Sequence, residues 1–329
     1  MSNDKQKRKL ILIIAIVLVL VNVIVFGVLF TDLSKYIWPE EPVVEVPDGY
    51  QVSDDGTITI DDITYKQKED GNYIVVSCEK YLTNIEIRDK INESDIGSVN
   101  EIGEKAFENC TEVTQINIPS TITKINNSVF SGCSKLTTIT IPYAVSEIGD
   151  SCFLGCKSLT SIKVHLSNTV FKSNNGVLYD INGKILYAYP YSKTDEQYKL
   201  ADNLISIEKN VFNGFDELQS VALPESLTNI GESAFENCKN LNNVLIPASV
   251  KTIGTNAFAN CGDNLIIYGE KGSYAETYAK ENNIIFKLSS ERPNPVQNEE
   301  NNTNENVTEI TGGITNSAEQ NVIKFSIRY

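Results

Sequence analysis

Histidine is nearly absent from this sequence of 329 residues, in which His165 is the only one. A lone histidine, with no serine or cysteine in a nucleophile motif, gives no support for acid–base or nucleophilic catalysis. It also leaves a metal site without the imidazole ligands that transition metals commonly use. The chain has neither a glycine-rich phosphate loop nor a dinucleotide-binding fingerprint. We therefore expect a protein that is not an enzyme, with no cofactor and no bound metal, and we place His165 in a surface turn.

Cysteine pairs of the Cys-x-x-Cys type are missing as well, although the chain has seven cysteines. Disulfides are usual in exported proteins, but an odd number of cysteines, most of them regularly spaced, favours buried free thiols. A bridge between neighbouring cysteines of the array is the alternative, and their parallel side-chain directions make its geometry poor. The seven are Cys78, Cys110, Cys133, Cys152, Cys156, Cys238 and Cys261.

Basic residues are outnumbered by acidic ones, and the formal charge is −15 with a pI of about 4.6. The first nine residues carry a net charge of +3, which leaves about −18 for the rest of the chain. This balance opposes binding to nucleic acid or to anionic lipid. Solubility is a sufficient reason for such a charge.

The chain has one long hydrophobic run, residues 10–30, which is long enough to span a bilayer as a helix. A cleaved signal peptide is the alternative, but it would be shorter and would end at a small-residue cleavage site, which residues 31–34 do not provide. The basic residues before the run predict a cytoplasmic N-terminus. We expect a single-pass anchor in the cell membrane, with all later residues outside the cell.

Isoleucine, phenylalanine and cysteine recur with a period of 23 residues, in two blocks of three copies. A period of this length is typical of leucine-rich repeats. The blocks are 59 residues apart, which is one period plus an insertion of 36 residues. The isoleucines are Ile102, Ile125, Ile148, Ile207, Ile230 and Ile253; the phenylalanines are Phe107, Phe130, Phe153, Phe212, Phe235 and Phe258; and the cysteine phase runs Cys110, Cys133, Cys156, Phe215, Cys238 and Cys261.

Each copy also contains an Ile-x-Ile-Pro segment or a close variant of it, such as Ile139 to Pro142, which predicts a short strand because it is β-branched and alternating; His165 stands at the proline position of its copy. One repeat cannot bury its apolar face alone, but stacked repeats can, at a strand spacing of roughly 4.8 Å. The isoleucines then point inward and the residue between them points outward. We expect the Ala-Phe pair to lie opposite the strand in one short helical turn, with the phenylalanine in the core.

The full pattern, IGxxAFxxCxxLxxIxIPxxV, is best seen in residues 230–250. With this motif the sequence resembles the BspA-like leucine-rich repeats of bacterial surface proteins, over about residues 63–288. The resemblance implies an α/β fold: a right-handed leucine-rich repeat solenoid with a parallel β-sheet on one face, here after the single transmembrane helix. It also implies export and a role in adhesion or partner binding. It implies no catalytic residues.

The domain organisation follows from these segments. The first unit is irregular, as the polar end of a solenoid must be, and the segment after residue 288 is rich in Asn, Glu, Ser and Thr, which predicts disorder. We expect a cytoplasmic basic segment at 1–9, the anchor at 10–30, an acidic Pro-containing spacer at 31–56, an N-terminal cap at 57–101, the solenoid at 102–268 with a hairpin insertion at 167–202, a C-terminal cap at 269–288 and a disordered tail at 289–329.

Several local elements are predicted outside the regular repeats. Turn residues at 70–71 and 182–183 each separate two strand-like runs, so each predicts a hairpin. Ser273 is an N-cap for a short helix, with Glu276 at the third helical position. The last residues, 321–329, alternate apolar and polar. They predict either a strand that docks on an exposed sheet edge, its own or a partner's, or an unstructured end. The other expected strands are 57–60, 63–66, 73–76, 85–87, 177–179, 185–187 and 284–286.

The outward positions of the repeat strands form the first candidate binding surface, on the concave face. Its last three residues are apolar, and exposed apolar groups on a concave surface are typical of docking sites. The adjacent row is small and uncharged, which suits a protein or glycan. The alternatives are that the tail or cap covers this surface, or that it has no role. The outward residues are Glu86, Asn117, Thr140, Lys163, Ala222, Leu245 and Ile266, and the adjacent row is Gln115, Thr138, Ser161, Ser220 and Asn243.

The insertion supplies the second candidate surface, because it concentrates tyrosines in one region. Tyrosine favours binding surfaces, since it adds contact area at little entropic cost. The alternative is that these rings cover the sheet and close the gap in the array. They are Tyr179, Tyr187, Tyr189, Tyr191 and Tyr198.

The sequence thus predicts a membrane-anchored extracellular protein that binds a protein or glycan, as in cell-surface adhesion. A structural or scaffolding component of a cell-envelope or signalling assembly is the alternative. Residues 10–30 make the membrane contact, no nucleic-acid partner is expected, and the sequence leaves the oligomeric state open.

Overall fold

The computed structural model describes residues 51–91, 97–193, 197–293 and 322–325. The chain divides into two compact units, Met1–Pro47 and Asp48–Tyr329, and the description below concerns the second. The predicted anchor, residues 10–30, lies outside the described residues, as does most of the spacer and of the tail. Among the helices that are described, none has the length and apolar character needed to cross a bilayer.

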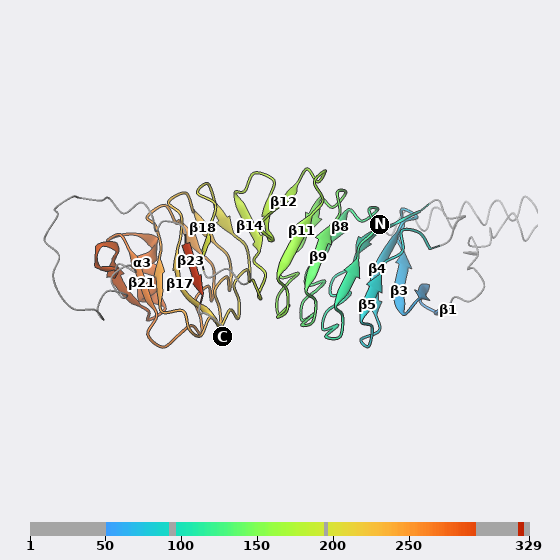
Figure 1. Cartoon of the computed structure of the whole chain (residues 1–329), viewed down its shortest axis with the longest axis horizontal. Coiled ribbons are helices and arrows are strands. Elements are labelled where there is room, and N and C mark those ends of the chain that lie inside the picture. Colours follow the sequence, from blue (N-terminus) through green and yellow to red (C-terminus); the bar gives the residue numbers. More distant parts are fainter. Residues whose placement is uncertain (1–50, 92–96, 194–196, 294–321, 326–329) are drawn as a thin grey trace, which may run out of the picture. The chain divides into compact units, whose positions relative to one another are not determined.

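The Ile-x-Ile segments form short parallel strands that stack in register (Figure 1). Isoleucines of successive repeats are paired, as Ile139 is with Ile162. This confirms the leucine-rich repeat solenoid predicted from the period of 23 residues. The strands on this outward face are β5 (Asn84–Glu86), β7 (Gln115–Asn117), β9 (Thr138–Ile141), β11 (Ser161–Val164), β17 (Leu218–Ala222), β19 (Asn243–Leu245) and β21 (Ile266–Gly269).

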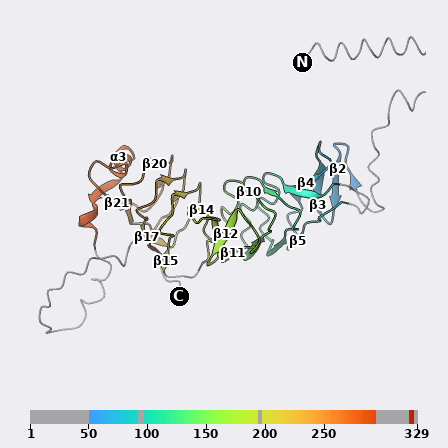
Figure 2. The same ribbon diagram turned by 90° about the horizontal axis from the view of Figure 1, so that it is seen from above.

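The residues just before each Ile-Gly corner form a second set of parallel strands, which the sequence did not predict and which belongs to two sheets, one on each side of the insertion. Figure 2 shows β10 and β20 on one side of the stack and β11 and β17 on the other. Each repeat therefore contributes two strands. The second set is β6 (Val99–Ile102), β8 (Lys124–Ile125), β10 (Glu147–Ile148), β16 (Ser206–Ile207), β18 (Asn229–Ile230) and β20 (Thr252–Ile253).

The Ala-Phe segment is a series of tight turns, so the expected helical turn is wrong. Within it, the Cys110 nitrogen donates to the Phe107 oxygen at 3.1 Å, while the Phe107 nitrogen donates to Val129 of the next repeat at 3.1 Å. Two residues per repeat have positive φ, and Gly or Asn fills the second of these positions because both tolerate it. That second position is Asn109, Gly132, Gly155, Gly214, Asn237 and Asn260.

The core consists of stacked phenylalanines beneath the strands. Phe212 and Phe235 have ring centroids 5.0 Å apart, and Phe235 and Phe258 have theirs 5.1 Å apart. The buried residues form two clusters that meet at the insertion. Alternate residues of one insertion strand belong to different clusters, Leu178 to the first and Tyr179 to the second. The insertion therefore closes both halves of the array.

Both predicted hairpins are present. In the cap, β1 (Gln51–Val52), β2 (Thr57–Ile60), β3 (Ile63–Gln67) and β4 (Tyr73–Cys78) are antiparallel neighbours, so the predicted spacer ends before residue 51. The insertion contains β12 (Phe171–Asn174), β13 (Val177–Asp180), β14 (Ile185–Ala188) and β15 (Gln197–Lys199). Neither β12 nor β15 was predicted; β12 pairs with β13 across a turn at Asn175 and Gly176, which both have positive φ.

The C-terminal cap contains the predicted helix and final strand. Helix α3 (Tyr274–Glu281) begins after Ser273, whose side chain accepts from the Glu276 nitrogen at 3.4 Å. Strand β22 (Ile285–Leu288) pairs with β21, and a 3-10 turn, η1 (Ser289–Glu291), follows. This turn lies in a region that the sequence assigned to the disordered tail.

The C-terminal strand β23 (Val322–Phe325) docks on the chain's own sheet (Figure 1). It runs antiparallel to β17 on one side and to β15 on the other. The insertion interrupts the outward sheet before β17, and β23 occupies the edge that this interruption leaves. Of the two predictions for this segment, docking on its own edge is confirmed.

Candidate binding groove

Three of the predicted outward residues lie side by side on the first half of the outward face. Asn117, Thr140 and Lys163 are all exposed, and Thr140 is in register with Lys163. Glu86 on β5 is in register with Asn117. This row therefore runs from a carboxylate through an amide and a hydroxyl to an ammonium group.

The second half of the face differs from the prediction in two places. Ala222 is 1% exposed and belongs to the interior. Ile266 is in register with Asn243, while Tyr268 pairs with Leu245. The prediction placed Ile266 beside Leu245 because it aligned Leu265, rather than Ile267, with Val244. The continuous apolar patch proposed from the sequence is therefore absent.

The chain also covers part of this second half itself. The Arg292 guanidinium donates to the Asn243 side-chain oxygen, from Nη2 at 3.1 Å and from Nε at 3.3 Å. Ser289 donates to the Glu270 carboxylate at 2.5 Å. The segment after β22 is thus attached to β19 and to the loop beyond β21, as one of the sequence-based alternatives stated.

A groove with a volume of about 590 Å³ lies over β7 and β9. Its lining contains no Asp, Glu, Lys or Arg, although the chain as a whole carries a charge of −15. Hydroxyl and amide side chains predominate over a floor of isoleucines. The lining residues are Thr114, Gln115, Ile116, Asn117, Ile118, Ser120, Thr137, Thr138, Ile139, Thr140, Pro142, Tyr143 and His165.

The groove lies where the outward sheet is interrupted. In the described chain, β5 pairs only with β7, and β9 pairs with β11, so these strands form two separate two-stranded sheets. On the opposite side, β6, β8 and β10 belong to one continuous sheet. The repeats are therefore joined behind the groove and separated at its surface.

The groove has hydrogen-bonding groups that face solvent. The side chains of Gln115, Thr138 and Thr140 are exposed and make no hydrogen bond to another described residue. The Asn117 side-chain amide donates one hydrogen bond to the Glu86 carboxylate, at 2.5 Å. A ligand in the groove would thus meet donors and acceptors without displacing internal hydrogen bonds.

Tyr143 and His165 form the wall of the groove beyond the strands. Tyr143 is 52% exposed, and its ring lies 5.8 Å from the imidazole in an edge-on arrangement. The His165 Nδ1 accepts from the Ser167 nitrogen at 3.1 Å, which places the proton of a neutral ring on Nε2. His165 lies in an exposed turn, as predicted.

A buried asparagine holds the loop that carries Tyr143. The Asn168 amide donates to the carbonyl oxygens of Pro142 and Val145, at 2.8 and 2.9 Å. Its oxygen accepts from the nitrogens of Val170 and Phe171. Asn168 is 5% exposed, so its two donated bonds hold the loop from inside, while the two accepted bonds hold the asparagine itself in place.

Sequence reasoning did not identify Tyr143 as a site residue. The signal was available in the period of 23 residues, since Tyr143 directly follows the proline of its repeat and His165 occupies the proline position of the next. Residues 23 positions apart are neighbours in the stack. Tyr143 and His165 are 22 positions apart, so they are also close.

The insertion tyrosines are mostly part of the core, which contradicts their expected exposure. Tyr179 and Tyr189 are 1% and 3% exposed. Tyr187 is half-buried against Phe171, with ring centroids 5.2 Å apart, and Tyr191 packs on Phe215 at 4.8 Å. The rings close the gap in the array, which was the alternative interpretation. The side chain of Tyr198 lies outside the described residues.

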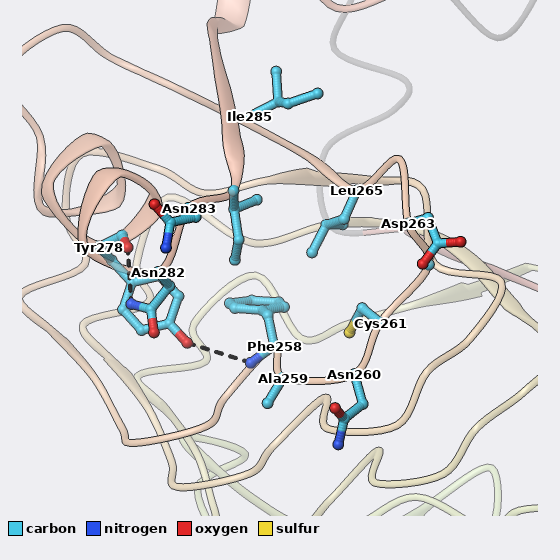
Figure 3. A pocket seen from close by; sticks show the side chains of 12 residues that line it. Phe258, Ala259, Asn260, Cys261, Asp263, Leu265, Tyr278, Asn282, Asn283 and Ile285 are labelled. Carbon is cyan, nitrogen blue, oxygen red and sulfur yellow. Dashed lines mark hydrogen bonds between the residues drawn. The ribbon is translucent and has the colours of Figure 1, made fainter.

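Another pocket, of about 280 Å³, lies at the end of the array between the last repeat and the cap (Figure 3). Its floor is Phe258 and Leu265, and Asn282 and Asn283 close one side. The Tyr278 hydroxyl accepts from the Phe258 nitrogen at 3.4 Å, so this polar group already has an internal partner. We interpret the pocket as space left where the cap meets a repeat.

All seven cysteines have free thiols in this structure, and all but Cys261 are buried. Burial raises the pKa of Cys133 and of Cys152 to about 12. These thiols are therefore protonated at neutral pH and unsuited to metal binding or nucleophilic attack. Among the described residues, no group of three or more His, Cys, Asp or Glu is arranged to hold a metal ion.

Comparison with known protein families gives one match. The model of the BspA type leucine-rich repeat region matches residues 81–180 and 185–283, in six copies. The matched segments include the strands of the groove and the insertion hairpin. No curated protein is similar enough in sequence to count as a relative.

Several solved structures resemble the chain in part. The pneumococcal vaccine antigen PcpA is 20% identical over 65% of this chain and 78% of its own, with a TM-score of 0.46. The leucine-rich repeat protein TpLRR of T. pallidum is 25% identical over 64% of this chain and 80% of its own, with a TM-score of 0.36. A leucine-rich cell surface protein of Faecalibacterium prausnitzii is 20% identical over 68% of this chain and 97% of its own, with a TM-score of 0.33.

Proposed function

This chain belongs to the BspA-type leucine-rich repeat family, and from that premise we propose that it is a binding protein of the bacterial cell surface whose ligand lies over β7 and β9. The observation that carries the proposal is the uncharged groove in a chain of charge −15. A solenoid supplies a surface rather than a reaction, so the function must be argued from such a site.

The lining favours a neutral glycan as the ligand. Sugar hydroxyls both donate and accept hydrogen bonds, which suits the side chains of Gln115, Thr138 and Thr140. The exposed ring of Tyr143 offers an electron-rich face to the weakly positive C–H groups of a sugar. A strongly charged ligand would find no counter-charge in the lining.

Residues 10–30 are the proposed membrane anchor, with the repeats outside the cell. The support is the length of the apolar run and the basic residues before it. Under this arrangement the groove faces the surroundings, where glycans of a host, a neighbouring cell or the envelope are available.

The proposal is tested by applying the purified full chain to an array of neutral and acidic glycans. Thr140→Lys places a long charged side chain in the groove and should reduce binding at least tenfold. Thr255→Lys is the matched control, because Thr255 is an exposed threonine outside the groove. Binding of an acidic glycan or a protein with no neutral glycan bound, or equal loss from both variants, would contradict the proposal.

A further inference from the structure

Two cysteines from different parts of the chain meet at the junction of the cap and the first repeat. Cys78 ends β4 of the cap, and Cys110 ends the first Ala-Phe turn segment, 32 residues later. Their sulfur atoms are 3.1 Å apart. Both residues are buried, with exposed fractions of 7% and 0%.

The other cysteines of this phase have a backbone partner, although Cys238 and Cys261 also share a hydrogen bond with each other. Each donates to a carbonyl oxygen of the preceding repeat, as Cys133 does to Phe107 at 3.2 Å and Cys156 does to Phe130 at 3.1 Å. Cys238 and Cys261 make the equivalent bonds. Cys110 is in the first regular repeat, so its neighbour on that side is the irregular cap, which supplies the thiol of Cys78 instead.

The positively charged side chain of Lys80 lies beside this pair of cysteines. The Lys80 ammonium is 3.6 Å from the Cys110 sulfur and also donates to the Glu108 carbonyl oxygen. The hydrogen bond from Cys78, helped by Lys80, lowers the pKa of Cys110, whereas the same hydrogen bond and burial raise the pKa of Cys78. Cys110 is therefore the thiol that ionises first, which makes it the nucleophile of the pair.

We propose that Cys78 and Cys110 form a disulfide that fastens the N-terminal cap to the first repeat. A bond of about 2.05 Å requires the sulfurs to approach by about 1 Å. Closing this gap takes a rotation of the two side chains and a shift of the cap against the first repeat. Within the regular cysteine ladder, parallel side-chain directions oppose bridging. The Cys78–Cys110 pair does not belong to that ladder, because Cys78 comes from the cap.

The oxidant is a disulfide, RS–SR, either of low molecular weight or carried by a thiol oxidoreductase. The Cys110 thiolate attacks one sulfur, the RS–SR bond breaks, and RS⁻ leaves from a mixed disulfide, Cys110–S–SR. Cys78 then gives up its proton, attacks the Cys110 sulfur and releases the second RS⁻. Two protein thiols are oxidised, and one RS–SR is reduced to two RSH after protonation.

The burial of both sulfurs predicts how the reaction proceeds. Exchange needs access to Cys110, so it occurs as the cap docks during folding or when the cap opens. Once formed, the bond closes a long loop and restricts the unfolded chain. We expect it to raise the melting temperature by roughly 5–10 °C.

The test is to unfold the purified full chain, refold it with oxidised glutathione present, alkylate it in denaturant without reductant, and map the peptides by mass spectrometry. We expect a Cys78–Cys110 crosslink with the other five thiols alkylated. Seven alkylated thiols, or a crosslink between other residues, would overturn the proposal. The assay uses the unmodified sequence, so its result is independent of any variant's ability to fold.

Variants supply the second readout. Cys78→Ala should abolish the crosslink and the rise in melting temperature on oxidation, and Cys156→Ala is the control that should keep both. If oxidation stabilises the Cys78→Ala variant as much as the unmodified chain, the bond is not the source of the effect. Ligand binding by the groove is a separate property and is unaffected by either result.

Discussion

The side chain of Asn168 links the two ends of the loop that carries Tyr143, through its bonds of 2.8 Å to Pro142 and 2.9 Å to Val145. This asparagine comes from the start of the insertion, one repeat later in the chain. The insertion therefore supports the wall of the groove, in addition to closing the array.

Replacing Asn168 with alanine should affect both stability and binding. The change leaves two carbonyl oxygens and two backbone N–H groups without their partner, at a cost of roughly 2–4 kcal/mol after partial rehydration. Binding should weaken as well, because Tyr143 loses its support. Urea unfolding and glycan titration measure the two effects.

The control for this variant is Asn203→Ala, which removes one exposed hydrogen bond of 3.0 Å to the Asn182 oxygen. We expect a loss within about 0.5 kcal/mol for such a surface change. Equal losses from the two variants would mean that the buried amide does not hold the loop.

The buried thiols predict a loss of stability in alkaline solution. The pKa of Cys133 and of Cys152 is about 12 in the folded chain, whereas an unfolded cysteine has a pKa of about 8.5. The folded state therefore keeps protons that the unfolded state releases. Each buried thiol contributes fully to the free energy of unfolding below about pH 8.5. This contribution decreases as the pH rises toward 12, and at pH 9.5 it has fallen by about 1.4 kcal/mol.

Urea unfolding at pH 7.5 and pH 9.5 measures this effect. Cys133→Ala should be less stable at the lower pH but should lose less between the two values, because one titrating thiol is gone. A pH dependence that is unchanged in this variant would contradict the assignment of the effect to Cys133.

Deleting residues 322–329 should expose the edge of β17. Backbone amides of β17 should then exchange with solvent at least tenfold faster, which corresponds to about 1.4 kcal/mol. An exposed edge is also a site for association, so the shortened chain should form dimers at high concentration. Deleting only residues 326–329 keeps β23 and should change neither property. Equal exchange in both deletions would show that β23 does not protect β17.

The proposed anchor predicts a defined topology. External protease on intact cells should remove an epitope tag at the C-terminus and leave a tag at the N-terminus intact. The N-terminal fragment should stay in the membrane fraction. Protection of the C-terminal tag until the membrane is broken would place the repeats on the other side, or would mean that the envelope masks them.

Sequence periodicity predicted the repeating parts of the fold and failed where the period changes. Buried Ile139 and Phe235 follow from the spacing of 23 residues, because stacking leaves them no other environment. Two residues are missing after Cys261, so the register of β21 depends on how the turn at Gly262 closes, and Ile266 was placed in the wrong row. The contact of Arg292 with Asn243 is non-local, and no pattern in the sequence indicates it.

The groove was predicted only in part. Asn117 and Thr140 were identified from the alternation of the strands, which fixes the direction of each side chain. The interruption of the sheet between β7 and β9 was not predicted, because the sequences of these two repeats match the motif as well as those of their neighbours do. Separation of adjacent strands depends on packing across the whole layer.

The central claim is that a neutral glycan occupies the groove over β7 and β9. The most direct measurement is amide hydrogen exchange on the full chain, with and without the tightest-binding glycan of the array. We predict slower exchange in residues 114–118 and 137–143 when the glycan is bound. Slower exchange confined to β19 and β21, or no change at saturating glycan, would contradict the claim.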